Sequence, residues 1–410
     1  MSGRPTGARR PRLERRSRVA PWLLVAVPAV SVAAALAVGA VALRLIGLDP
    51  LTVYREMLRS GFTTWFGFTD TLSSATPLIL TGLAAAVAFR FHLYNVGAEG
   101  QLYVGAIAAS SVALALGPDV PQAAAVVAVI LAGMAGGMLW IAVPALTRAW
   151  LGTSEIITTL LLNYVALYLM RYLIFGSASF WRDPTSTNFP QGLRIPAAAE
   201  FPQYGTTRIH LGLLVAVIAA VLVHVALTRT RVGYELRVYG DSPAAARYAG
   251  ISVRRAVLVA LLASGALAGL AGAGEIAGRA RQLDPQGLAL GLGYAGIIVA
   301  ALARYNPLSV MLVAVLLGGI RNAGTALQSL PGARVPIAIS TMLEGAILLF
   351  TLGGELFVRY RLRTGRSPQP AAGPAEASAG APAPGVPASP AEPPPASAPG
   401  PAPASRSEQP

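Results

Sequence analysis

The chain has 410 residues, of which 54% are hydrophobic and only 12% are charged. A soluble domain carries about 25% charged residues, so this composition excludes an ordinary soluble protein and indicates an integral membrane protein. The net charge of +14 does not indicate nucleic-acid binding, because the basic residues stand at the ends of apolar runs and not on one soluble face.

The residue types that are missing exclude several kinds of chemistry. The sequence has no Cys, so it offers no disulfide and no thiolate metal ligand. Its three His, at positions 92, 210 and 224, lack the spacing of a metal site. The sequence has no Lys, and all 32 of its Lys-plus-Arg residues are Arg. Without Lys the chain cannot form the phosphate-binding loop GxxxxGK[ST]. We therefore expect no cofactor, no metal and no ATP binding of that kind.

The N-terminal segment 1–18 carries seven Arg and one Glu. The apolar run 20–43 that follows is longer than the about 7–15 residues of a signal-peptide core, so it predicts an uncleaved first span. Further apolar runs follow in chain order at 72–89, 101–117, 122–146, 156–175, 209–228, 256–274, 289–303, 307–322 and 335–353.

The runs predict an all-α, polytopic integral membrane protein with about 10 transmembrane helices, in a range of about 8–10. Several runs are shorter than the ~20 residues of a plain span and are rich in Gly. Short, Gly-rich runs are typical of broken or re-entrant helices beside a cavity.

The stretch NVGAEG, residues 95–100, lies between the runs 72–89 and 101–117. It is too polar and too rich in Gly for a lipid-facing helix, so it predicts a helix break. Irregular backbone at membrane depth is tolerated where it lines a cavity or is buried in protein. Its polar groups would be satisfied by neighbouring helices or by a bound polar solute.

Polar side chains inside the apolar runs are candidates for a solute pathway, because they are costly at membrane depth. A structural alternative stays open for each of them. Glu99 could pin neighbouring helices, and Asn163 could bond between helices. Glu155 follows Thr-Ser at an expected helix start, where a carboxylate favours the positive end of the dipole. The pathway candidates are Asn95, Glu99, Gln101, Thr158, Asn163 and Glu344, the last with Arg321 as a possible partner.

The loop 229–255 contains six Arg and is the longest one expected to be cytoplasmic. It predicts a short helix over 243–249 with small side chains, which would let another surface approach closely. The helix is either a docking site for a cytoplasmic partner or an ordinary connector in a basic loop. Its start and stop signals are Asp241 and Ser242 as N-cap residues, Pro243 at the first helical position and Gly250 at the end.

The Arg distribution predicts the orientation. Three segments, 1–18, 229–255 and 359–366, hold 17 of the 32 basic residues. Cytoplasmic loops are rich in Arg, and ten spans place all three segments on the cytoplasmic side. They also place the nearly charge-balanced loops 47–71 and 176–208 outside, so both termini are expected in the cytoplasm.

The sequence thus divides into four parts. A basic cytoplasmic N-terminus (1–18) precedes a transmembrane domain (19–358) and a basic juxtamembrane segment (359–366). The C-terminal segment 367–410 contains 14 Pro, much Ala and no aromatic residue. Such a composition cannot bury a core, so we expect a disordered tail.

Four sequence blocks stand out, in this order: YNVGAEGQLYVGA (94–106), TSEIITTLLLNYVALYL (153–169), GYELRVYGDSPAAARYAGI (233–251) and GYAGIIVAALARYNPL (293–308). With these blocks the chain resembles the permease subunits of ABC importers, in the branched-chain amino acid and simple-sugar superfamily, and looks most like the longer permease of purine nucleoside importers. The resemblance covers about residues 50–360, with Tyr94 in place of a usual Phe, Ser154 in place of a usual Asn, and Asp241 where Asn is common.

The resemblance implies a transport subunit in the bacterial plasma (inner) membrane that is not itself an enzyme. Its partners would be two ATP-binding cassette subunits, a second homologous permease and an extracytoplasmic solute-binding lipoprotein. The ATPase subunits would hydrolyse ATP and dock on the segment 241–250. The coupling candidates are Gly240, Asp241, Ala245, Tyr248 and Gly250.

Several functions stay open on sequence alone. An ABC permease for nucleosides is the first, and an ABC permease for simple sugars or branched-chain amino acids is the second. A secondary transporter driven by an ion gradient is a third, in which Glu99 or Glu344 would bind the coupling ion. A membrane enzyme ranks last, because the sequence shows no convergent nucleophile, base or metal cluster.

Overall fold

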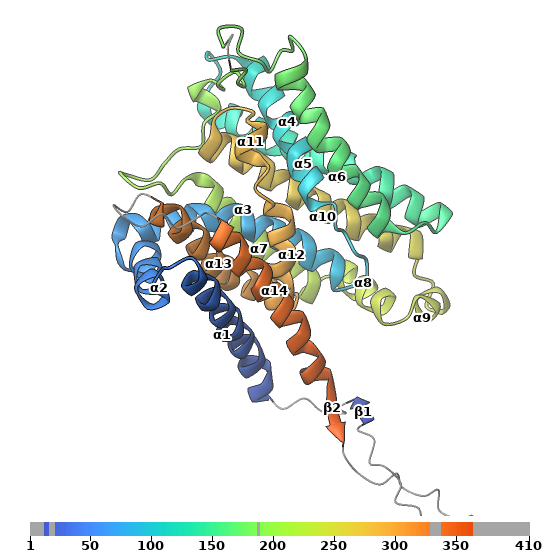
Figure 1. The fold of residues 1–410 in the computed structure, drawn as a ribbon. Helices are drawn as coiled ribbons and strands as arrows, with labels where there is room; N and C mark the ends of the chain where they lie inside the picture. Colours follow the sequence, from blue (N-terminus) through green and yellow to red (C-terminus); the bar gives the residue numbers. More distant parts are fainter. Residues whose placement is uncertain (1–11, 16–20, 187–188, 329–337, 364–410) are drawn as a thin grey trace, which may run out of the picture. The chain divides into compact units, whose positions relative to one another are not determined.

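The computed structural model describes residues 12–15, 21–186, 189–328 and 338–363 (Figure 1). Within them, each of the ten apolar runs falls largely in one helix. These helices are α1 (Pro21–Leu45), α3 (Trp65–Phe89), α4 (Ala98–Leu116), α5 (Gln122–Leu146), α6 (Glu155–Arg171), α7 (Leu211–Arg229), α10 (Val253–Glu275), α12 (Leu292–Leu302), α13 (Pro307–Leu327) and α14 (Ala338–Arg359).

Shorter elements connect or extend the long helices. The α-helical ones are α2 (Pro50–Leu58), α8 (Arg231–Asp241), α9 (Pro243–Tyr248) and α11 (Pro285–Leu288). The π-helical turns are η1 (Arg59–Thr63), η2 (Thr147–Leu151), η3 (Tyr172–Gly176) and η5 (Ile276–Ala280), and η4 (Ala197–Ala199) is a 3₁₀ turn. The short strands are β1 (Arg12–Arg15) and β2 (Tyr360–Arg363).

The all-α, polytopic prediction is confirmed. In the described part of the chain, 8 helical segments are long and apolar enough to cross a membrane, and α1 adds a shorter apolar stretch, Ala29–Leu45. Residues 13–361 form one compact unit, which holds every helix of the described residues. Of the expected terminal parts, the tail 367–410, residues 1–11 and 16–18 of the N-terminus, and residues 364–366 of the juxtamembrane segment lie outside the described residues.

A broken span is present near the C-terminal end of the domain. Helix α11 ends at Leu288 and α12 begins at Leu292. Gly291 between them has a φ of +70°, a left-handed conformation that Gly adopts without strain. The break leaves α12 only 11 residues long, so its first amide groups need acceptors inside the protein.

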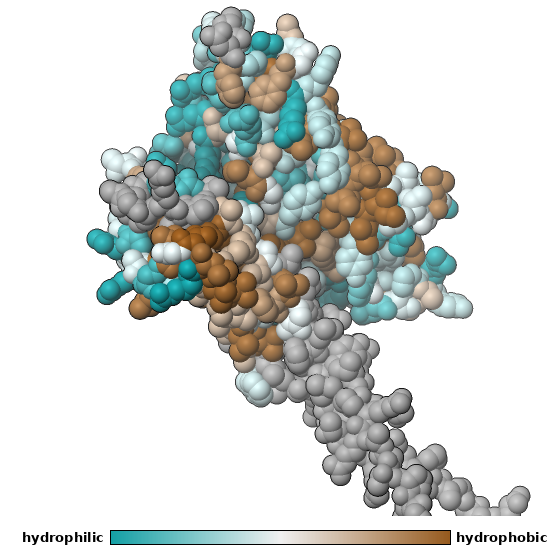
Figure 2. Space-filling model, in the orientation of Figure 1, coloured by the Kyte–Doolittle hydropathy of each residue, from teal (hydrophilic) through white to brown (hydrophobic). Residues whose placement is uncertain are grey.

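Helix α10 packs against α3, α4 and α5 at the centre of the domain. In the most apolar window of each span, α3 is 89% buried but the α6 segment is only 22% buried, so α3 is an inner helix and α6 an outer one. Figure 2 shows hydrophobic side chains gathered over α5 and α6, with hydrophilic ones toward both ends of these helices. This pattern fits helices that meet lipid along their middle.

Glycines allow the central helices to approach closely. A Cβ on Gly269 of α10 would lie 2.1 Å from the carbonyl oxygen of Gly133 on α5, and a Cβ on Gly105 of α4 would lie 2.4 Å from that of Gly269. Gly265 and Gly137 make a similar contact between α10 and α5. Small residues at such crossings let backbones pack by van der Waals contact, which is a main source of helix association in a membrane.

The loop after α6 packs back onto the segment that leads to α11. Ile195 donates its amide to the carbonyl of Arg281 at 2.9 Å, and Phe201 donates to Ala277 at 2.8 Å. The Glu200 carboxylate pairs with Arg281 at 3.0 Å. The loop therefore covers the same end of the domain as the broken span.

The glycine contacts predict that Gly269→Ala destabilises the protein, because the added methyl group meets backbone atoms that cannot move aside cheaply. Overpacking of this kind costs about 1–3 kcal/mol. Thermal unfolding of the purified protein in detergent measures the loss as a lower Tm.

Gly274→Ala on the same helix is the matched control, because a Cβ there meets nothing within 4 Å. Equal Tm values for the two variants would contradict the close packing at Gly269.

Candidate functional site

The predicted helix break at 95–100 is present only at 95–97, which belong to the non-helical segment 90–97 between α3 and α4. Residues 98–100 already form the first turn of α4. The Asn95 side chain is fully buried. Its Nδ2 donates to Gln101 Oε1 and to Ser264 Oγ, both at 2.8 Å. Its Oδ1 accepts from the Gly97 amide and from Gln101 Nε2, both at 2.9 Å. Asn95 and Gln101 thus satisfy each other and fix the entry of α4 against α10.

Glu99 stands in the first turn of α4 and is 3% exposed. Its carboxylate accepts from the amide of Gly291 at 3.1 Å, from the amide of Gly293 at 2.5 Å and from the Tyr103 hydroxyl at 2.5 Å. The two amides belong to the start of α12, so Glu99 caps that helix. A carboxylate is favoured there by charge-assisted hydrogen bonds and by the positive end of the helix dipole.

Asn163 links α6 to the same region. Its Oδ1 accepts from the Gly100 amide at 2.8 Å, and its Nδ2 donates to the carbonyl of Val96 and the hydroxyl of Tyr294, each at 3.0 Å. Tyr294 lies on α12 and is 38% exposed, so it joins the buried amides to the domain surface. Tyr294 was not among the predicted pathway residues, although it is the second residue of the block GYAGIIVAALARYNPL.

The structure therefore brings most of the pathway candidates together, but it buries them. Asn95, Glu99, Gln101 and Asn163 are 0–3% exposed, and their polar atoms bond to the protein. Thr158 is half-buried and donates to the carbonyl oxygens of Ser154 and Glu155. Glu344 lies in α14 with its side chain outside the described part. Arg321 donates to the carbonyl of Leu290 at 2.9 Å, beside the broken span.

Glu155 makes a second link to the segment 90–97. It is buried, pairs with Arg148 Nε at 3.2 Å and accepts from the Tyr94 amide at 3.2 Å. The expected place in the first turn of α6 is confirmed, but the partner Arg148 was missed because it belongs to a different helix. Burial raises the pKa of Tyr239, while the Arg148 guanidinium beside it acts in the opposite direction.

The predicted short helix is present as α9 (Pro243–Tyr248), one residue shorter than expected. Ser242 is its N-cap, and its hydroxyl accepts from the Ala245 amide at 3.2 Å. Gly250 follows the helix with a φ of +73°. The N-cap role expected for Asp241 is wrong, because residues 231–241 form a helix of their own, α8, in which Asp241 is the last residue.

The five coupling candidates differ in where they lie. Tyr248 is 95% exposed, and Asp241, Ala245 and Gly250 are exposed as well. Gly240 instead faces inward, where a Cβ would lie 3.1 Å from Cα of Phe91. The Gly240 carbonyl also contacts Nδ1 of His92 at 3.0 Å. The exposed helix α9 is thereby connected, through α8, to the segment that carries Asn95.

The described residues contain no group of three or more His, Cys, Asp or Glu that could hold a metal ion. The arrangement instead offers a polar, hydrogen-bonded interior between helices and an exposed helix at one end. It can hold helices in register and present a docking face.

Comparison with known proteins assigns the chain to a family. Residues 67–352 match the family described as the permease component of branched-chain amino acid transport systems. The chain belongs to this permease family. It is 36% identical to a glucose ABC transporter permease of Haloferax volcanii, with 89% of this chain and 97% of the relative covered.

Two further relatives are named for nucleosides. A guanosine ABC transporter permease of Bacillus subtilis is 34% identical, with 79% of this chain and 92% of the relative covered. A nucleoside ABC transporter permease of Lactococcus lactis is 30% identical, with 80% and 90% covered. The resemblance to ABC permeases is confirmed, and the secondary-transporter and membrane-enzyme alternatives lose their support.

The Glu99 contacts predict that Glu99→Gln destabilises the permease. The amide keeps the volume of the carboxylate, but its NH2 group cannot accept from an amide of α12. Leaving a buried donor unsatisfied costs about 1–3 kcal/mol, which a lower Tm would report.

Tyr103→Phe is the comparison variant, because it removes one donor and keeps both amide contacts of Glu99; its Tm should fall less. If Glu99→Gln keeps the wild-type Tm but abolishes transport, Glu99 acts on the solute pathway and not as a helix cap.

Proposed function

We propose that this permease is the membrane subunit of an ATP-driven importer that takes up nucleosides. One observation supports the separation of transport and ATP hydrolysis onto different subunits. Helix α9 is exposed and capped, and it belongs to a permease without a GxxxxGK[ST] loop. Energy must then come from another polypeptide. The proposed partners are two ATP-binding cassette subunits on α9, a second homologous permease, and an extracytoplasmic solute-binding lipoprotein.

The nucleoside assignment is supported by two of the relatives above, which are named for guanosine and for nucleosides. A nucleoside carries no net charge, several hydroxyl groups and a flat base. It requires hydrogen-bonding groups and an aromatic surface more than a charged clamp. Tyr294 offers both, because its ring is partly exposed and its hydroxyl is held by Asn163.

The proposed pathway passes Tyr294 and Thr158, which reach the surface of the domain. In this proposal Asn95, Glu99, Gln101 and Asn163 shape the pathway by holding its walls. Their saturated hydrogen bonds keep α4, α6 and α12 in fixed positions. Glu344 remains a candidate outside the described side chains.

A simple sugar is the second candidate solute, since the glucose permease of Haloferax volcanii is similar over nearly the whole chain. Uptake into cells that express the complete transporter separates the two. We expect import of labelled guanosine that excess unlabelled glucose does not inhibit. Inhibition by glucose, together with import of labelled glucose, would replace the nucleoside by a sugar.

Tyr294 variants test the pathway in the same assay. Tyr294→Ala should reduce guanosine uptake strongly, by about tenfold or more, since base–aromatic stacking contributes about 1–3 kcal/mol. Tyr294→Phe keeps the ring and should retain more uptake. Normal uptake by Tyr294→Ala would place the pathway elsewhere.

The exposure of Tyr248 predicts that Tyr248→Ala weakens ATPase docking. Truncating an aromatic residue at the centre of an interface costs about 2 kcal/mol or more. We expect reduced co-purification of the ATPase subunits and loss of solute-stimulated ATP hydrolysis, and the same from Ala245→Trp through steric block.

Tyr234→Ala on α8 is the matched control, because Tyr234 is 60% exposed and lies outside α9. Normal ATPase assembly by Tyr248→Ala and Ala245→Trp would show that the contact lies elsewhere.

We also propose a bacterial plasma membrane location with both termini and α9 in the cytoplasm, supported by the Arg distribution. Reporter fusions after residue 366 and within the loop 176–207 test it. We expect a cytoplasmic signal at 366 and an external one in the loop. An external signal at 366 would contradict the ten-span orientation.

A further inference from the structure

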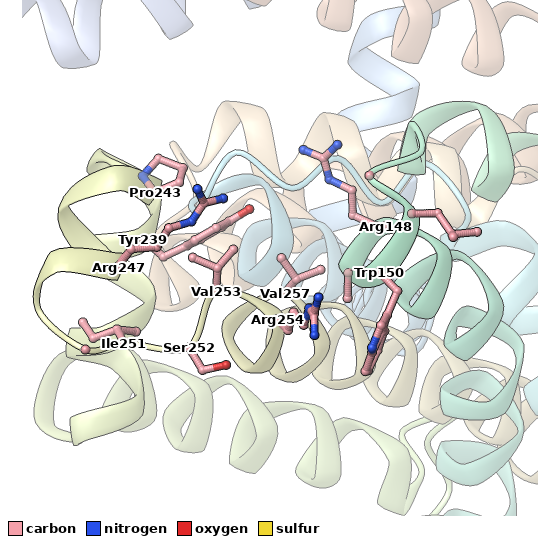
Figure 3. Close-up of a pocket in the computed structure, with 14 residues that line it drawn as sticks. Arg148, Trp150, Tyr239, Pro243, Arg247, Ile251, Ser252, Val253, Arg254 and Val257 are labelled. Carbon is pink, nitrogen blue, oxygen red and sulfur yellow. The ribbon is translucent and has the colours of Figure 1, made fainter.

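A cavity of about 820 Å³ lies beside α9 (Figure 3). In Figure 3, Tyr239 and Arg247 come from the α8–α9 segment on one side of it. Arg148 and Trp150 come from η2 at the end of α5, on the other side, and Arg254 comes from the start of α10 between them. None of the residues proposed for the solute pathway lines this cavity.

The cavity is strongly basic. Three Arg line it, and none of its lining residues is acidic. Arg148 is paired with Glu155. Arg254 lies 5.8 Å from the ring centre of Trp150. The Arg247 side chain is exposed, and no hydrogen bond or ion pair joins its guanidinium group to another described residue. At least two guanidinium groups are therefore available to an anion.

The N-terminus of α10 adds to this positive potential. Ser252 and Val253, the N-cap and first residue of this 23-residue helix, line the cavity. The Ser252 hydroxyl accepts from the Arg255 amide at 3.4 Å. The first amide groups of a helix have no intrahelical acceptor, and the helix dipole favours an anion near them.

One wall of the cavity is apolar and stands at the end of two membrane spans. The segments Gln122–Leu151 and Val253–Ala280 both have an end here. Trp150 is 51% exposed and Leu151 is 73% exposed. Trp at the end of a span is typical of the membrane–water interface. A ligand here would meet guanidinium groups with one part and exposed apolar side chains with another.

We propose that this cavity binds the phosphate headgroup of an anionic phospholipid, with the acyl chains along Trp150 and Leu151. Basic pockets between transmembrane helices bind such headgroups. A docked acidic protein fits less well, because α9 has two sides. Its Pro243 and Arg247 line the cavity, whereas the fully exposed Tyr248 does not. Of the coupling candidates, only Gly250 lines the cavity, whereas Tyr248 and Ala245, which the ATPase tests address, do not. The proposal does not depend on the transported solute.

The test uses the full chain purified in a neutral detergent. Phosphatidylglycerol, phosphatidylcholine and inorganic phosphate are added in separate titrations, and binding is followed by Tm and by native mass spectrometry. We expect phosphatidylglycerol to bind and to raise Tm, and phosphatidylcholine and inorganic phosphate to do neither at equal concentration. The double variant Arg247→Gln/Arg254→Gln should bind phosphatidylglycerol about 10- to 30-fold more weakly.

Arg255→Gln is the control, because Arg255 is exposed, neighbours Arg254 and does not line the cavity. It should bind as the wild type does. Arg247→Gln alone breaks no side-chain hydrogen bond or ion pair within the described residues, so a folded variant of the cavity is available even if the double variant unfolds.

Four results would overturn the proposal. If phosphatidylglycerol and phosphatidylcholine bind equally and raise Tm equally, the cavity does not recognise the anionic headgroup. An equal effect of inorganic phosphate would make this a site for free phosphate. Wild-type affinity in the double variant, and in Arg247→Gln, would move lipid binding elsewhere. If the double variant binds phosphatidylglycerol as the wild type does but no longer assembles with the ATPase subunits, the cavity is a protein docking face.

Discussion

The carboxylate of Glu99 holds the broken span of this permease in place. An acidic group at mid-membrane costs about 2.5–3.5 kcal/mol on insertion scales, and a helix start without acceptors inside a membrane is costly as well. The buried carboxylate and the free amide groups of the helix start satisfy each other, because the Glu99 oxygens accept hydrogen bonds from the amides of Gly291 and Gly293. The short helix α12 can then begin inside the protein, and its Tyr294 is held by Asn163 at the surface.

This arrangement requires the helices around it to lie at fixed distances. The glycine contacts among α4, α5 and α10 supply that precision, because backbones in van der Waals contact cannot slide without opening a gap. Gly293 shows the same constraint at the cap itself, where a Cβ would lie 2.3 Å from the Glu99 amide nitrogen. Close packing and the buried carboxylate therefore depend on each other.

The same polar segment also connects the interior with the exposed end of the domain. His92 contacts the carbonyl of Gly240, and Glu155 holds the Tyr94 amide while it pairs with Arg148. A displacement of α8 and α9 would thus shift residues 92–95, which lie next to the start of α4. The proposed docking of ATPase subunits at α9 would reach the helices of the proposed pathway by this route. The basic cavity beside α9 shares Arg148 with this route, so a bound lipid headgroup would act at the same place.

The sequence by itself determined the features that depend on local chemistry. A membrane span needs a continuous apolar run, so ten runs predicted ten helices. Capping groups lie within three residues of the amides they accept from, so Ser242, Pro243 and Gly250 predicted α9 almost to the residue. The four blocks in order also predicted the permease family that the comparisons confirm. The preceding helix α8 was not predicted, so Asp241, its last residue, was wrongly assigned as an N-cap of α9.

Only the tertiary structure decided what the buried polar residues do. The amides that Glu99 accepts from lie 192 and 194 residues further along the chain, and the Asn163 partner Tyr294 lies 131 residues away. A sequence shows that such side chains are costly in a membrane, but the same cost is met by a solute, by water or by a distant helix end. Which of these applies depends on how the helices pack, and that packing is fixed by contacts between Gly residues on α4, α5 and α10 that no local pattern pairs.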